Sequence, residues 1–154
     1  RRPRIIAMVY NVYPDGRQRE EMFEKLFKTF KEKDDFVFYI MGNGWKEMLD
    51  RMVKEGLKVN YMDKFYGDLY QQVLMTSDYL LFTGGEDSLA QSIVDATNAG
   101  LRVIAPPQNG LEVEYPFNNQ KELNKIFENI NANPVKNWTW NNYAKQHLKI
   151  WETL

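Results

Sequence analysis

Short apolar runs alternate along the chain with longer segments whose apolar residues recur every three or four positions. The short runs predict buried strands and the longer segments predict amphipathic helices, an alternation typical of parallel β-α units. We expect strands over 5–9, 36–41, 57–62, 79–82 and 102–105, with a short sixth strand over 110–113. The predicted helices cover 19–33, a segment around 48–53 that Gly56 ends, a short segment around 69–74, 88–99 with Gly100 as its cap, a segment around 123–130, and 139–154.

The strands over 36–41 and 79–82 are apolar throughout rather than at alternate positions. Strands of this kind are buried on both faces, as in a parallel sheet covered by helices. The sequence therefore predicts an α/β domain, a Rossmann-like, doubly wound parallel sheet of about six strands with helices on both faces. Such sheets bind ligands at the carboxyl ends of their strands, which directs attention to the turns over 11–17, 42–45, 63–66 and 83–88.

Composition narrows the class of protein. A length of 154 residues with 44% hydrophobic residues fits one globular domain over 1–154. A formal charge of −1 gives no global electrostatic reason to bind nucleic acid, and the lack of cysteine excludes disulfides, thiolate metal sites and cysteine nucleophiles. No apolar run approaches the roughly 20 residues of a membrane span. We expect a cytoplasmic protein with no nucleic-acid partner and no metal.

The turn over 83–88, Thr-Gly-Gly-Glu-Asp-Ser, lies between a predicted buried strand and a helix. Glycines let the backbone approach a ligand, and a helix N-terminus offers N–H groups to an anion. Phosphate binding and simple capping by Asp87 or Ser88 both explain this turn. Asp95 lies roughly 12 Å further along the helix, too far from Asp87 for the acid pair of a glycosidase. The spacing would let the two carboxylates bind opposite ends of an extended ligand, although from the residues alone an acid on a solvated helix face is the simpler interpretation of Asp95.

Residues 79–105, YLLFTGGEDSLAQSIVDATNAGLRVIA, resemble the donor-site signature of the retaining GT-B glycosyltransferases of the "glycosyl transferases group 1" type. In that signature a strand, a Glu-containing glycine turn and a helix with Glu-Ala precede a Gly-x-Pro-Val-Ile strand. FVFYIMGNGW looks like the family's strand ending in Gly-x-Gly, and TWNNYAKQHLKIW resembles its closing Trp-centred helix. The resemblance implies the C-terminal half of a GT-B fold, with residues 1–4 as a linker remnant and the N-terminal acceptor-binding domain absent from this chain.

By this resemblance, Asp87 takes the place of the first signature Glu and faces the donor sugar, with Glu86 as the alternative first acid. Arg17 would neutralise the charge that develops on the leaving diphosphate, and Arg19 is the neighbouring candidate. Asp95 would accept the ribose hydroxyls. The other implied donor-binding positions are Gly84, Gly85, Ser88, Leu89, Ala90 and Gln91 around the diphosphate, Lys64 and Phe65 beside the base, Gly42 and Gly44 making room beneath it, and Asn11 where the family has Arg.

The resemblance implies a retaining transferase that moves a hexose-type sugar from a nucleoside diphosphate, with UDP favoured, to a glycan, lipid or protein acceptor in polysaccharide biosynthesis. It implies no cofactor. We expect this chain alone to bind the nucleotide sugar but to be inactive, because the reaction occurs between the two halves; a peripheral membrane contact would involve the missing half. Aspartates at both Glu positions and Asn11 in place of Arg leave open a non-catalytic binding or scaffold module. A nucleotide-sugar epimerase of similar architecture is the other alternative.

Overall fold

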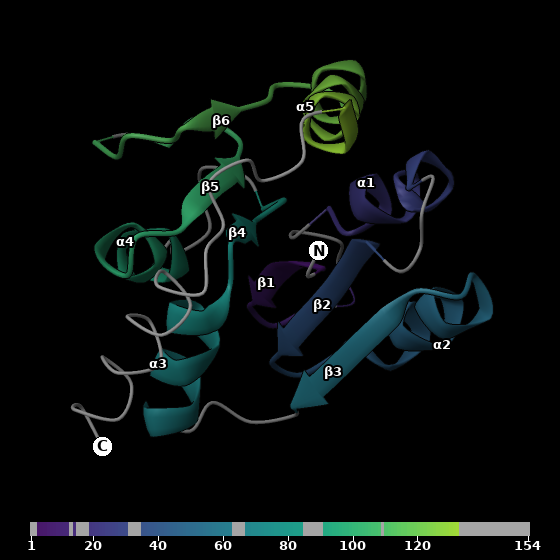
Figure 1. Ribbon diagram of the computed structural model, residues 1–154, viewed down its shortest axis with the longest axis horizontal. Coiled ribbons are helices and arrows are strands. Elements are labelled where there is room, and N and C mark those ends of the chain that lie inside the picture. The colour runs from purple at the N-terminus through teal and green to yellow at the C-terminus, as the bar shows by residue number, and fades with distance from the viewer. Residues whose placement is uncertain are drawn as a thin grey trace.

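The computed structural model describes residues 3–12, 14, 19–30, 35–62, 67–84, 91–108 and 110–132, with only the backbone of 131 and 132. Within these residues the centre is a six-stranded sheet in the order β3-β2-β1-β4-β5-β6 (Figure 1). The strands are β1 (Arg4–Val9), β2 (Phe36–Met41), β3 (Lys58–Met62), β4 (Tyr79–Leu81), β5 (Arg102–Ala105) and β6 (Tyr115–Pro116). Every neighbouring pair is parallel, which confirms the predicted fold class.

Helices cover both faces of this sheet (Figure 1). One face carries α1 (Glu21–Glu24), the 3₁₀-helix η1 (Phe27–Thr29), α2 (Lys46–Lys54) and α5 (Gln120–Ala132). The other face carries α3 (Gly67–Thr76) and α4 (Gln91–Asn98). The chain leaves β1 toward β2 and leaves β4 toward β5, so it turns in opposite directions on either side of the β1–β4 pair.

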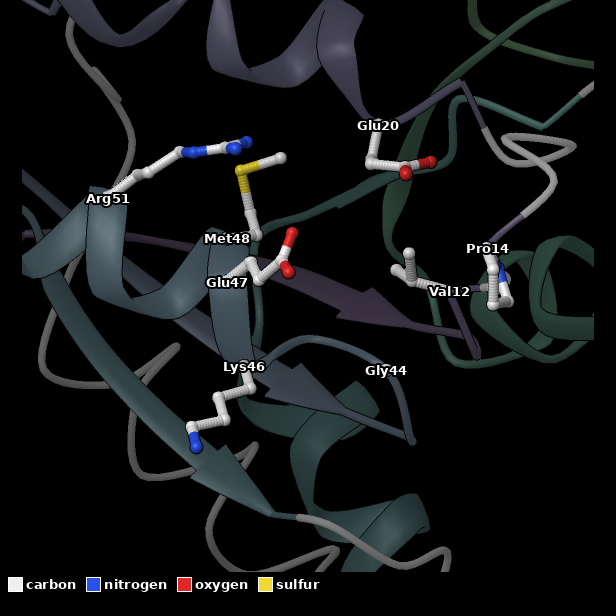
Figure 2. Close-up of a pocket in the computed structure, with 8 residues that line it drawn as sticks. All are labelled: Val12, Pro14, Glu20, Gly44, Lys46, Glu47, Met48 and Arg51. Carbon is white, nitrogen blue, oxygen red and sulfur yellow. The ribbon is translucent and has the colours of Figure 1, made fainter.

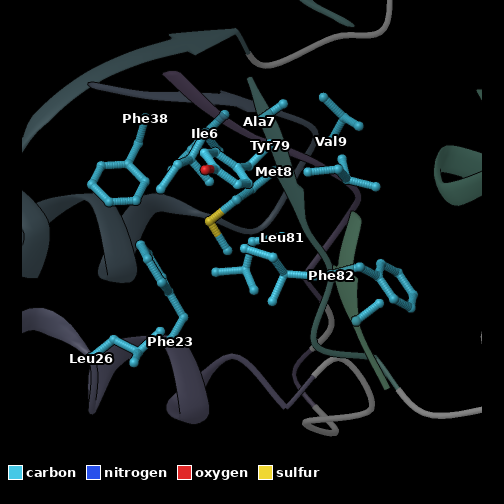
Figure 3. Packing of buried hydrophobic residues seen from close by; sticks show 14 of the residues in the cluster. Ile6, Ala7, Met8, Val9, Phe23, Leu26, Phe38, Tyr79, Leu81 and Phe82 are labelled. Atoms are coloured by element: carbon cyan, nitrogen blue, oxygen red, sulfur yellow. The ribbon is translucent and has the colours of Figure 1, made fainter. Parts of the chain in front are cut away.

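The core follows from the apolar strands. Alternate side chains of β1 point to opposite faces of the sheet, and Figure 3 shows Met8 on the same side as Phe23 and Phe38, with Val9 and Phe82 on the other. Aromatic rings fill the layer beneath α1 and α5: the centroid of Phe30 lies 5.5 Å from that of Phe38 and 5.4 Å from that of Phe127. Edge-to-face contacts of this kind anchor both helices to β2.

The predicted helix over 19–33 is wrong in its extent. The structure has one short turn of α-helix, α1, followed by η1, and Phe30 is already extended with ψ 98°. The carbonyl oxygen of Leu26 accepts from the Thr29 amide at 2.9 Å and from the Thr29 hydroxyl at 2.6 Å. The Thr29 side chain thus takes up the carbonyl that would continue the α-helix, and the tighter 3₁₀ turn results.

The sixth strand also differs from its predicted place. It forms at Tyr115–Pro116 rather than over 110–113. Gly110 has φ +76° and the amide of Leu111 donates to the Gln108 carbonyl oxygen, so this segment is a turn with one isolated bridge. The first five strands lie within one residue of their predicted bounds. The last predicted helix, over 139–154, lies outside the described residues.

Candidate functional site

The chain changes direction between β1 and β4, and doubly wound sheets bind ligands in the crevice outside the carboxyl ends of the strands at such a point. The segments that border this crevice are 10–12 after β1 and 82–84 after β4. The hydroxyl groups of Tyr10 and Thr83 lie 3.2 Å apart and join the two segments, and both side chains are buried. Burial raises the pKa of the Tyr10 hydroxyl above its ordinary value, so this group stays protonated near neutral pH.

Arg19 binds the segment after β4. Its Nε donates to the carbonyl oxygen of Thr83 at 2.9 Å, and its Nη2 reaches the carbonyl oxygen of Gly84 at 3.5 Å. Arg19 also has φ +49°, a left-handed conformation that costs a non-glycine residue free energy. The structure therefore places both Arg19 and Gly84 at the crevice. The guanidinium group holds the turn there while its positive charge stays beside Gly84.

Asp95 on α4 is held by two protein donors. The Tyr70 hydroxyl on α3 donates to Asp95 Oδ2 at 2.7 Å, and Gln91 Nε2 donates to Asp95 Oδ1 at 3.0 Å. Burial, and next the hydrogen bond to Asp95 and its charge, raise the pKa of Tyr70 well above its ordinary value. Tyr70 is consequently a lasting donor to the carboxylate. Gln91, expected beside the diphosphate through its backbone, uses its side chain to orient Asp95.

Gly42 and Gly44 do not leave an open space where a Cβ atom would be. A Cβ added to Gly42 would overlap the Tyr10 carbonyl oxygen, and one added to Gly44 would overlap the Val12 carbonyl oxygen. Both glycines have positive φ, +133° and +87°. The main chain of Tyr10 and Val12 thus fills the space at these two Cβ positions, and the expected role of the glycines beneath the base stays a prediction. They let the loop after β2 approach the segment after β1.

Asn11 supports the same close approach. Its Oδ1 accepts from the Asn43 amide at 2.9 Å, and the Val12 amide donates to the Asn43 carbonyl oxygen at 2.8 Å. The buried Trp45 ring adds a 2.7 Å bond from its Nε1 to the Tyr10 carbonyl oxygen. Where the resemblance places a cationic side chain, this protein thus has an amide that ties two loops together.

Several of the expected site residues lie outside the described residues. These are the catalytic candidates Arg17, Glu86 and Asp87, and the donor-binding candidates Lys64, Phe65, Gly85, Ser88, Leu89 and Ala90. The structure describes the others. Asn11, Arg19 and Gly84 lie on the segments that border the crevice, Gly42 and Gly44 lie in the loop after β2, and Gln91 and Asp95 lie on α4. Their roles in donor binding stay predictions.

Sequence reasoning missed Tyr70 and also a cavity beside the segment after β1. Tyr70 and Asp95 are 25 positions apart on different helices, so no local spacing connects them.

The cavity, of about 530 Å³, lies beside the segment after β1, between the starts of α1 and α2. Figure 2 shows Glu20 and Glu47 on different sides of it, with Lys46 pointing away from both. The residues that line it are Val12, Pro14, Glu20, Gly44, Lys46, Glu47, Met48 and Arg51.

Among the described residues, no three His, Cys, Asp or Glu side chains lie together in a way that could hold a metal ion. None of the helices described is both long enough and apolar enough to cross a membrane.

Comparison of the sequence with protein-family models and with curated proteins finds no match. Solved structures do match the fold. The catalytic domain of a cholesterol-α-glucosyltransferase from Helicobacter pylori superposes with a TM-score of 0.64 at 16% identity over 97% of each chain. The C-terminal domain of LpcC, a group 1 glycosyltransferase from Francisella tularensis, gives 0.64 at 14% identity over 86% of this chain and 78% of that one.

HepE from Anabaena, solved with UDP and glucose, gives a TM-score of 0.62 at 16% identity. The match covers 83% of this chain and only 38% of HepE, so this chain corresponds to a part of that larger protein. Identities this low establish the fold alone. The chain has the α/β fold found in GT-B glycosyltransferases, and this fold matches that of the C-terminal domain, as the sequence motifs led us to expect.

Proposed function

We propose that this chain is the donor-binding domain of a retaining glycosyltransferase and binds a nucleoside diphosphate sugar, with UDP favoured. The observation that carries this proposal is the carboxylate of Asp95 on α4, which two side-chain donors hold in place. A carboxylate of this kind can accept hydrogen bonds from two neighbouring hydroxyl groups of a ribose. HepE, which shares the fold, was solved with UDP and glucose, which supports the choice of ligand.

Charge at the crevice supports an anionic group. Arg19 brings a permanent positive charge beside Gly84, where the chain leads toward α4. A diphosphate bound there would have Arg19 nearby and, by the sequence resemblance, Arg17 as its second cation. Transfer of a hexose-type sugar would then require a second domain that supplies the acceptor, so this chain alone would bind the donor without turnover.

Calorimetric titration of the chain with UDP, GDP, ADP and their hexose conjugates tests donor binding. We expect saturable binding of one nucleotide and a loss of at least about tenfold in affinity for Asp95→Ala, since hydrogen bonds to a charged group contribute about 1.5–3 kcal/mol. Asp50→Ala is the matched control, because Asp50 is an exposed aspartate on α2. A folded wild-type chain that binds none of these nucleotides contradicts the proposal.

One observation favours a second candidate, a non-catalytic binding module. The side-chain oxygen of Asn11 accepts a hydrogen bond from the Asn43 amide, and Asn11 brings no positive charge to the diphosphate. Activity of the longer protein that is lost in Asp87→Ala would eliminate this candidate. Release of free UDP only when an acceptor is present would also separate transfer from epimerisation.

A further inference from the structure

The hydrogen bond between Tyr70 and Asp95 connects the two helices on one face of the sheet. Tyr70 lies in the first half of α3, is partly buried, and donates to Asp95 Oδ2 at 2.7 Å. Gln91, one turn before Asp95 on α4, donates to the other oxygen, Oδ1, at 3.0 Å. The two donors bind different oxygens and therefore fix the plane of the carboxylate.

The carboxylate retains capacity for a ligand. An ionised carboxylate has two oxygens with about four lone-pair sites, and the hydrogen bonds from Tyr70 and Gln91 use two of them. Among the residues that the structure describes, one site on each oxygen thus remains for a further donor. Two neighbouring hydroxyl groups on one ring, as in ribose, match this arrangement, because each hydroxyl can donate to a different oxygen.

We propose that Tyr70 is a positioning residue that orients Asp95 toward the two ribose hydroxyls and so makes the site select ribonucleotides over 2′-deoxyribonucleotides. This inference rests on the proposed donor-binding function. Tyr70 itself need not touch the nucleotide. Its hydroxyl holds the short aspartate side chain in one orientation. Without this hydroxyl the plane of the carboxylate is no longer fixed, and the paired contact to both ribose hydroxyls is lost.

A purely structural role for Tyr70 leads to a different result. If the hydroxyl only tied α3 to α4, its removal would lower the affinities for UDP and for 2′-deoxy-UDP by the same factor. If it positions Asp95, its removal would lower the affinity for UDP by a larger factor than the affinity for 2′-deoxy-UDP, since that ligand has only one of the two hydroxyls to lose. The ratio of the two affinities therefore separates the roles.

The experiment titrates the chain with UDP and 2′-deoxy-UDP, and with the corresponding guanine and adenine nucleotides, in wild type and in Tyr70→Phe. We expect wild type to prefer the ribonucleotide by about tenfold or more, and Tyr70→Phe to lower this ratio toward one, because its affinity for the ribonucleotide falls by the larger factor. Tyr115→Phe is the matched control. Tyr115 is another partly buried tyrosine, and its ring lies against Tyr79 at the start of β4. The ratio of ribonucleotide to deoxynucleotide affinity in Tyr115→Phe should equal that of wild type.

Three outcomes overturn the inference. Equal losses of affinity for both nucleotides in Tyr70→Phe would leave a structural tie only, and no change in either affinity would show that Tyr70 does not orient Asp95. A wild-type chain that binds UDP without ribose preference would also refute it while donor binding stands. Failure of every nucleotide to bind the wild-type chain would overturn the proposed function as well, so the two failures are distinguishable. Thermal melting without nucleotide verifies that Tyr70→Phe is folded.

Discussion

The Nε of Arg19 donates to the carbonyl oxygen of Thr83 at 2.9 Å, across 64 positions of sequence. This bond joins the start of the first helical segment to the turn that follows β4, so the two sides of the crevice are connected by a charged group. Because the acceptor is a main-chain carbonyl, the bond fixes the course of the turn itself rather than the orientation of a side chain.

Removal of the Arg19 side chain should lower stability and nucleotide affinity together. We expect Arg19→Ala to reduce the free energy of unfolding by about 1–2 kcal/mol through the lost charged hydrogen bond. Arg19→Gly should be more stable than Arg19→Ala by up to about 1 kcal/mol, because glycine adopts φ +49° without strain. Urea denaturation measures both values, and equal stabilities would show that the left-handed conformation carries no strain.

Arg51→Ala is the control for that prediction. Arg51 forms an ion pair with Glu24 at 3.1 Å, with half of its side chain exposed. Exposed pairs contribute between zero and about 1 kcal/mol, so this substitution should change stability by less than about 0.5 kcal/mol and leave nucleotide affinity unaffected.

Gly44→Ala should be strongly destabilising. The new methyl group would overlap the Val12 carbonyl oxygen at a residue with φ +87°, so the steric and conformational costs add to about 3 kcal/mol or more. Gly56→Ala is a matched control, since Gly56 has φ +84° but no atom within 4 Å of the added Cβ. The free energy of unfolding of Gly56→Ala should fall by only about 1 kcal/mol. Similar losses in chemical denaturation for the two variants would disprove close packing at Gly44.

Stability should fall as the pH rises above about 10, the ordinary pKa of tyrosine. Burial raises the pKa values of Tyr10 and Tyr70 in the folded protein. Above pH 10 the unfolded chain has therefore lost these protons while the folded chain keeps them, which favours unfolding by up to about 1.4 kcal/mol per pH unit for each group. Urea midpoints measured over a pH series should fall less steeply in Tyr10→Phe. An unchanged slope would contradict the assignment to Tyr10.

Asp78 should be important for the centre of the sheet. Its Oδ2 accepts from the Ile5 amide at 2.8 Å, and its own amide donates to the Ile5 carbonyl oxygen at 2.8 Å. Asp78→Ala leaves the Ile5 amide without its side-chain acceptor and should cost about 1–3 kcal/mol of stability. Asp78→Asn retains a carbonyl acceptor and should lose less. Equal effects of the two substitutions in denaturation would argue against this role of the side-chain oxygen.

Sequence patterns predicted the strands well because burial on both faces leaves a continuous apolar run, as in β2 and β4. The helix after β1 was wrong beyond its first turn, since the competition of the Thr29 hydroxyl for the Leu26 carbonyl depends on conformation that an apolar periodicity does not record. The same applies to the bonds of Arg19 and Tyr70, which join residues 64 and 25 positions apart. Such contacts become visible only when the sheet brings its elements together.

The strand order also bears on how this chain is made. β1 pairs with β2 soon after both are synthesised, but its other edge waits for β4, which begins about 70 residues later at Tyr79. Until then β1 presents an open, apolar strand edge, and such edges recruit other chains. Pairing between distant strands is also slow. During synthesis the crevice therefore forms only after β4 has been made, and premature chain termination before β4 would yield an aggregation-prone product without the crevice.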